Sequence, residues 1–153
     1  MRRLLKTLLL LSAAMAVARL TATVVSRQFE EGSEVSDEFR RVRCMDGLDF
    51  TSRAAGLRRA RVSVVLGGAK VDLRNAVIDP AGATISLENT LGGLVLNVRD
   101  DWAVTIDEVL VGGGENEVRV TPPHELPEDA PRLRVEVVTR LGGTVITTGG
   151  TGR

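Results

Sequence analysis

The sequence has 153 residues, enough for one domain with a short appendage, and its 43% of hydrophobic residues can supply a buried core. Twenty basic and 20 acidic residues cancel, which excludes the basic surface of a nucleic-acid-binding protein, and a single cysteine, Cys44, excludes an internal disulfide. Aromatic residues make up only 3%, so the core must come from Val, Leu, Ile and Ala, residues that suit thin β-layers.

An apolar segment opens the chain at residues 1–27, after basic residues at positions 2, 3 and 6. The run Leu4–Val25 has 22 residues, long enough to cross a hydrocarbon core of about 30 Å. Arg19 lies near the end of that run, where its side chain can reach the headgroups. Three interpretations stay open: a single-pass anchor in the cell membrane, which we expect, a signal peptide cleaved after Ala16-Val17-Ala18 with secretion of the rest, or an amphipathic helix.

Residues 28–47 are predicted to be a polar linker, because acidic residues, serines and glycine dominate and no apolar residue recurs with a period before Phe39. A basic patch follows at Arg58, Arg59 and Arg61. We interpret this patch as a charged sheet edge that discourages aggregation.

Residues 48–148 alternate apolar and polar side chains over many short runs, which predicts strands with one buried face. The apolar positions of these runs are Val71 and Leu73, Ile85 and Leu87, Leu96 and Val98, Val104 and Ile106, Val118 and Val120, and Leu133, Val135 and Val137. Turn residues separate the runs at 79–82, 100–101 and 121–123. We predict no amphipathic helix after residue 27, and a disordered tail at residues 149–153.

An apolar residue followed by a glycine pair recurs four times, at intervals of 25, 20 and 30 residues. We interpret the pairs as structural turn glycines, at places where a strand bends sharply or meets another backbone closely. They are Gly67, Gly68, Gly92, Gly93, Gly112, Gly113, Gly142 and Gly143. Alignment of the copies on these glycines matches Asn116 with Ile146.

The repeat predicts an all-β fold, a β-solenoid or β-helix-like stack of Gly-Gly units behind an N-terminal membrane helix. Each unit of such a stack buries its apolar face only against its neighbours. An antiparallel β-sandwich with glycine bulges stays open as the alternative, because the spacing of the copies is uneven.

We find no catalytic, cofactor-binding or metal-binding residues and predict that the protein is not an enzyme. The one histidine, His124, has no histidine or cysteine partner for a metal site. Asp100 and Asp101 fall where a turn is expected, and Trp102 is interpreted as a cap on an aromatic-poor core rather than a ligand platform. Residues 112–114 lack the Gly-Lys-Ser/Thr ending of a phosphate-binding loop.

Several phrases of the β-region, taken in order, resemble the C-terminal domain of LiaF-type proteins, the cell-wall-active antibiotics response family. They are residues 64–76 (VVLGGAKVDLRNA), 83–87 (ATISL), 91–93 (LGG), 102–104 (WAV), 111–113 (VGG), 130–135 (APRLRV) and 141–143 (LGG). The resemblance covers residues 48–148 and implies a β-rich domain on a membrane anchor that acts in envelope stress signalling through protein contacts. Well-known members carry several membrane spans before this domain, whereas this sequence has a single candidate.

We therefore expect a membrane-tethered, non-enzymatic β-domain with a protein-interaction role in the bacterial cell-envelope stress response. We expect it to bind a protein partner, with signalling components among the candidates, and to bind the membrane through residues 4–25. We expect no nucleic-acid partner and no cofactor. Two alternatives stay open: a self-assembling β-solenoid module, and an exported domain that binds wall polymer around Trp102.

Overall fold

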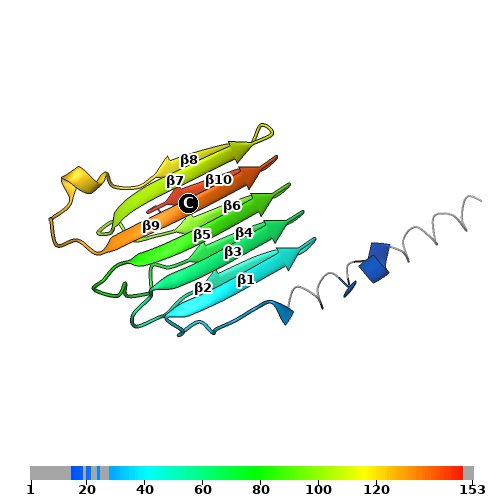
Figure 1. Cartoon of the computed structure of the whole chain (residues 1–153), viewed down its shortest axis with the longest axis horizontal. Coiled ribbons are helices and arrows are strands. Elements are labelled where there is room, and N and C mark those ends of the chain that lie inside the picture. Colours follow the sequence, from blue (N-terminus) through cyan, green and yellow to red (C-terminus); the bar gives the residue numbers. More distant parts are fainter. Residues whose placement is uncertain (1–14, 19, 22–23, 25–27, 150–153) are drawn as a thin grey trace, which may run out of the picture.

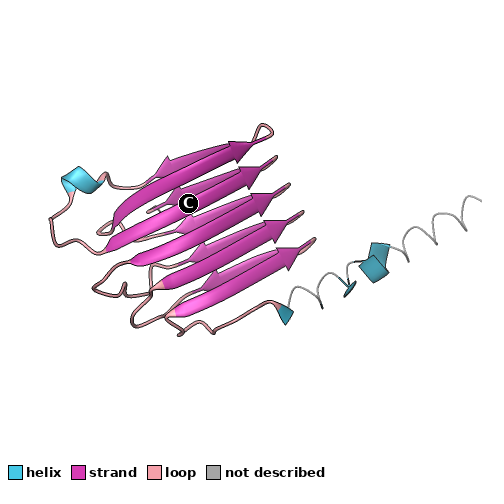
Figure 2. Cartoon of the chain, viewed as in Figure 1, coloured by secondary structure: helices cyan, strands magenta, loops and turns pink. Residues whose placement is uncertain are grey.

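The computed structural model describes residues 15–18, 20–21, 24 and 28–149, and strands make up most of that part of the chain. The strands are β1 (Glu38–Cys44), β2 (Gly47–Thr51), β3 (Arg59–Val65), β4 (Gly68–Asp72), β5 (Ala83–Thr90), β6 (Gly93–Asn97), β7 (Ala103–Val111), β8 (Glu115–Arg119), β9 (Arg132–Arg140) and β10 (Gly143–Thr147). A single turn of 3₁₀ helix, η1 (Pro123–Glu125), lies between β8 and β9. Figure 2 shows the strands as two facing layers.

The ten strands form two five-stranded sheets, in the orders β1-β3-β5-β9-β7 and β2-β4-β6-β10-β8. Every pairing between these strands is parallel. The predicted all-β class is confirmed. The antiparallel sandwich kept as the alternative is wrong, because strands joined by a tight turn enter opposite sheets instead of pairing with each other.

The building unit is a β-arch, in which one strand of the first sheet turns directly into the next strand, in the second sheet. The chain makes five arches: β1/β2, β3/β4, β5/β6, β7/β8 and β9/β10. Arches stack in register, so that equivalent residues such as Gly68 and Gly93 lie side by side. Inward-facing Val, Leu and Ile of both sheets fill the space between the layers.

The arches do not stack in chain order (Figure 1). The last arch, β9/β10, lies between β5/β6 and β7/β8, so β7/β8 forms one end of the stack and β1/β2 the other. The first arch turns at Met45 and Asp46 rather than at a glycine pair, so the glycine repeat did not predict it. Strand β1 lies inside the interval predicted as a polar linker, residues 28–47, so that prediction is wrong from Glu38 onward.

The first glycine of each of the three Leu-Gly-Gly turns is required because neighbouring turns approach closely. A Cβ on Gly92 would lie 2.3 Å from the carbonyl oxygen of Gly67, and one on Gly142 would lie 2.4 Å from that of Gly92. The second glycine has no such restriction, since a Cβ on Gly68 or Gly93 meets nothing within 4 Å. The left-handed φ of these turns falls on the preceding leucine and not on a glycine.

The third glycine-pair copy differs from the others. Its turn contains three residues, 112–114, against two in the last arch, and both Gly112 and Gly113 have positive φ. Val111 lies beside Arg140 and not beside Leu141, and this offset of one residue together with the extra turn residue places Val118, and not Asn116, beside Ile146. The predicted match of Asn116 with Ile146 is therefore wrong, because it set Val111 against Leu141 and assumed turns of equal length.

The N-terminal region is described only in part. Residues 15–18, 20–21 and 24 are helical, and most of the predicted anchor lies outside the described residues. Within the part of the chain that the structure describes, no helix combines the length and apolar character needed to cross a membrane. Of the predicted tail, residues 150–153 also lie outside the described residues.

Candidate interaction surface

One end of the stack, at β1/β2, is closed by an inward-facing arginine. The guanidinium of Arg41 lies 4.3 Å from the ring centroid of Phe50 and 5.7 Å from that of Phe39. It donates hydrogen bonds to the carbonyl oxygens of Glu31, Arg40 and Gly32. Burial lowers the pKa of Arg41, and the charge of Glu34 opposes this shift. A charged side chain at this position covers the apolar interior and hinders a further strand from pairing at the β1/β2 end.

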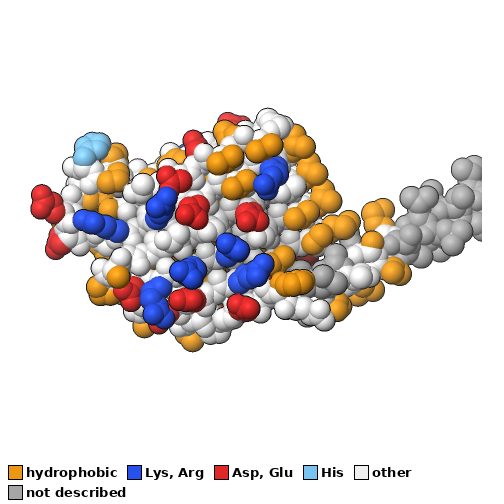
Figure 3. All heavy atoms as spheres, viewed as in Figure 1, with side chains coloured by type: hydrophobic (Ala, Val, Ile, Leu, Met, Phe, Trp, Pro, Cys, Tyr) orange, Lys and Arg blue, Asp and Glu red, His pale blue; other side chains and the backbone are white. Residues whose placement is uncertain are grey.

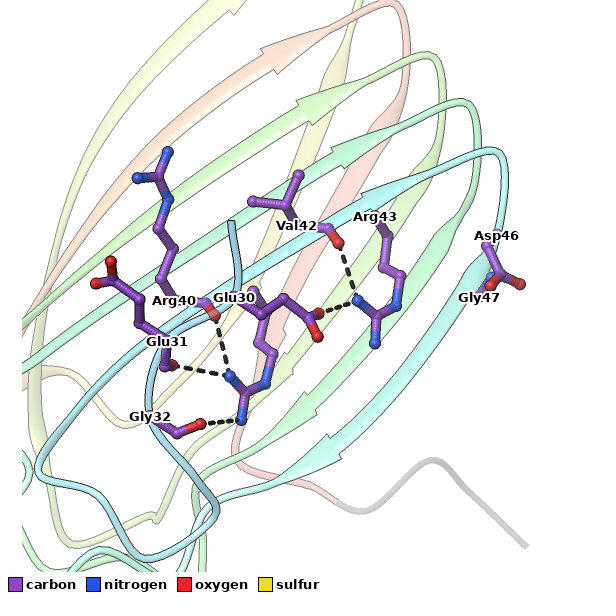
Figure 4. A network of polar contacts seen from close by, with 9 residues as sticks. Glu30, Glu31, Gly32, Arg40, Val42, Arg43, Asp46 and Gly47 are labelled. Carbon is purple, nitrogen blue, oxygen red and sulfur yellow. Dashed lines mark hydrogen bonds and ion pairs between the residues drawn. The ribbon is translucent and has the colours of Figure 1, made fainter. Parts of the chain in front are cut away.

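The segment before β1 covers the same end (Figure 4). Glu31 and Arg40 form an antiparallel bridge, with backbone N–H···O distances of 3.1 and 2.9 Å. The carboxylate of Glu30 forms an ion pair with Arg43, whose side chain also bonds the carbonyl oxygen of Val42. The outer edge of β1 is therefore partly occupied by the protein's own chain.

The other end of the stack, at β7/β8, is open. Within the described residues no strand lies beyond β7 or β8. From Thr105 onward β7 contains no fully buried residue, and the exposed apolar side chains of this end are Val109, Leu110, Val111 and Val118. Ile106 and Val120 are only partly buried against the core. The interior of the fold thus reaches the surface here.

The free edges of β7 and β8 also offer unpaired backbone groups. Ala103 donates its N–H to Pro131, and the carbonyl of Val111 accepts from Leu141, so these residues face β9. Because the direction of the backbone hydrogen-bonding groups alternates along a strand, the N–H and C=O of Ile106, and of every second residue of β7 before and after it, point away from β9. The N–H of Glu115 donates to the carbonyl oxygen of Gly142, directly before β10, which leaves the N–H of Val118 on the open side.

A polar chain crosses the interior near the turns and links three arches. Asn89 of β5 donates to the carbonyl oxygen of Gly143 at 2.8 Å and to the hydroxyl of Thr144 at 3.4 Å. Thr139 lies 2.8 Å from the hydroxyl of Thr144 and donates to Asn116 at 2.7 Å. Because these bonds join β5, β9/β10 and β8, they favour the observed order of the arches.

The aromatic, acidic and histidine residues that the sequence analysis considered and rejected as functional lie in the core or in turns. Trp102 is buried and belongs to the core, so its prediction as a core cap is confirmed. Asp100 and Asp101 lie in a turn, and Asp101 bonds Arg99, which lowers the pKa of the Asp101 carboxyl. His124 is exposed in η1, where its Nε2 lies 3.8 Å from a carboxylate oxygen of Glu125.

Among the described residues, no group of three or more His, Cys, Asp or Glu side chains is arranged to hold a metal ion. A surface hollow of about 650 Å³ is open and lies over the starts of β5, β7 and β9. Its Arg134 is held by Asp107 at 2.8 Å. The candidate interaction surface is the open end, which in the sequence is marked by three consecutive apolar residues, 109–111, that break the alternation.

An ion pair at the end of β4, between Asp72 and Arg74, predicts how the stability of the fold depends on pH. Asp72 accepts bonds from the backbone and side chain of Arg74, and the side-chain bond lowers the pKa of the carboxyl. A carboxyl whose pKa is lower in the folded state than in the unfolded state stabilises the fold at pH values above the unfolded pKa. That stabilisation is lost as the pH falls through the folded pKa. We expect acid to remove up to about 1 kcal/mol of unfolding free energy through this pair, because Arg74 is partly exposed. Urea unfolding across the acidic range should show that loss reduced in Asp72→Asn, and an equal loss in both proteins would contradict it.

The chain matches no protein-family model, no curated protein and no solved structure. The surface itself is therefore the basis for a functional proposal.

Proposed function

We propose that this protein is a membrane-tethered, non-enzymatic β-solenoid domain that binds a protein partner by strand addition at the β7/β8 end. The observation that carries the proposal is the difference between the two ends. The β1/β2 end is covered by Arg41 and the preceding segment, whereas the β7/β8 end exposes apolar side chains and unpaired backbone groups. Stacked arches with one closed and one open end are a template for an additional strand.

The partner that fits this end is an extended peptide segment with alternating apolar residues. Because Ile106 of β7 and Val118 of β8 lie in different sheets, this segment would place one strand against the outward N–H and C=O groups of β7 and a second strand against those of β8, and its apolar side chains would cover the open interior. The resemblance to LiaF-type domains, together with the apolar residues 4–25, supports a tethered role in the envelope stress response. Self-association of the same edge is the second candidate, because an identical chain also carries alternating strands.

The test uses a proline in the edge strand β8. Val118→Pro removes an N–H that points outward and leaves the N–H groups that bond β10 in place. Val118→Thr is the matched control, because it keeps the N–H. A photoreactive residue at Val109, which is 55% exposed on β7, reports contacts in cells, and the same residue at Val77, 57% exposed and far from this end, reports background.

We expect protein adducts at position 109 in the parent and in Val118→Thr, and their loss in Val118→Pro. An adduct at twice the mass of the chain identifies self-association, and any other mass identifies a different partner. Adducts no stronger at position 109 than at position 77 would reject the proposal.

A further inference from the structure

Three leucines at the turns of successive arches combine backbone strain with exposure. Leu66, Leu91 and Leu141 have φ values of 51°, 54° and 51°, in the left-handed region. Their side chains are 50%, 48% and 56% exposed. We call these three residues the turn ridge.

The backbone conformation of these positions does not favour leucine. The left-handed conformation disfavours bulky L-residues and is tolerated by glycine and asparagine. Half of each side chain faces solvent, so folding gains little from its burial. Strained residues that the fold does not require point to a contact outside the fold.

The ridge is continuous along the stack. The N–H of Leu66 bonds the carbonyl of Thr90, the N–H of Leu91 bonds that of Arg140, and the N–H of Leu141 bonds that of Val111. Successive leucines are therefore one strand spacing apart, about 4.8 Å. The exposed Val65 and Val111 lie beside them, and Figure 3 shows apolar side chains gathered along this edge of the molecule.

The N-terminal segment leaves the domain on the same side. The ion pair of Glu30 with Arg43 places the start of the segment near the turn that follows β1, and the segment then runs antiparallel to β1. Phe29, the residue before Glu30, is exposed. The described chain thus enters the domain on the side that carries the turn ridge, and residues 4–25 precede this segment in the sequence.

We propose that the turn ridge lies against a lipid surface, so that the domain rests on the membrane with its turns in the headgroup region and its stack axis parallel to the bilayer. The inference rests on the membrane tether of the proposed function. The tether brings the ridge to the membrane, where exposed leucines bury apolar surface and the neighbouring Arg140 meets anionic headgroups. The β7/β8 end then faces sideways and stays accessible to a protein.

The experiment uses the full chain with vesicles of equal parts phosphatidylethanolamine and phosphatidylglycerol. An environment-sensitive fluorophore is placed on Val65→Cys beside the ridge, or on Val77→Cys as the control, both in a Cys44→Ser background. Brominated lipid quenches only a fluorophore that touches acyl chains. The ridge is removed by the triple substitution Leu66→Asn, Leu91→Asn and Leu141→Asn, which places a residue that tolerates left-handed φ at each turn.

We expect the label at position 65 to shift to the blue and to be quenched by brominated lipid, while the label at position 77 stays unchanged. The triple variant should keep the parent's Tm or exceed it, remain with the vesicles through its N-terminal segment, and lose the signal at position 65. Chain that sediments with vesicles but shows water-exposed labels at both positions would overturn the ridge contact and leave the tether standing. Failure of the chain to sediment with vesicles would overturn both the ridge contact and the membrane tether. A label at position 65 that shifts to the blue but is not quenched by brominated lipid would indicate a protein contact and overturn the lipid proposal.

Discussion

Replacing Gly92 with alanine should lower the free energy of unfolding by about 2–4 kcal/mol. The added Cβ would lie 2.3 Å from the carbonyl oxygen of Gly67 and 3.1 Å from the side-chain oxygen of Asn89. The first contact is with backbone held by a hydrogen bond, since the carbonyl of Gly67 accepts the N–H of Gly93 at 3.0 Å. Relief of the clash therefore requires the stack to separate locally, and urea unfolding of the variant measures that cost.

The neighbouring glycine provides the matched control. A Cβ on Gly93 meets nothing within 4 Å, and Gly93 does not have positive φ. Gly93→Ala should therefore change the unfolding free energy by less than about 1 kcal/mol, on the stabilising side, because alanine restricts the unfolded chain. Equal losses for the two variants would show that the turns do not approach as closely as described.

Replacing Asn89 with aspartate should destabilise the fold by about 3–5 kcal/mol at neutral pH. Asn89 is fully buried, and its amide nitrogen donates to the carbonyl oxygens of Gly92 and Gly143 at 3.1 and 2.8 Å. A carboxylate at this position has no proton to donate, so two carbonyls lose their donor and a charge is buried. The substitution changes hardly any volume, which separates the loss of hydrogen bonds from a cavity effect.

The pH dependence of Asn89→Asp provides a second readout. Burial and the facing carbonyls favour the neutral carboxyl, so its folded pKa should lie above the unfolded value of about 3.9. The protonated form is then favoured in the fold, and the destabilisation relative to the parent should grow as the pH rises through the folded pKa and shrink in acid. Asn75→Asp, at an exposed turn position, is the control and should show neither effect. A destabilisation that does not change with pH would contradict this account.

Local features of the fold were predictable because they depend on a few consecutive residues. Alternation such as that of Val71 in β4 and Leu73 directly after it indicates which side chains face inward, whichever strands lie beside β4. The linker prediction failed at β1 because Arg41 occupies an inward position, where a charged residue hides the period-two pattern. Only the position of Arg41 at the end of the stack makes that burial possible.

The sequence by itself determined that the chain makes strands with one buried face, and that tight turns recur at Leu-Gly-Gly. Only the tertiary structure decided which glycine of each pair is required, because the clash at Gly92 involves Gly67, 25 residues away. It also decided the order of the arches, since arches of similar cross-section can stack in any order. The bonds of Asn89 to the last arch favour the order observed, and that order leaves β7/β8 as the open end.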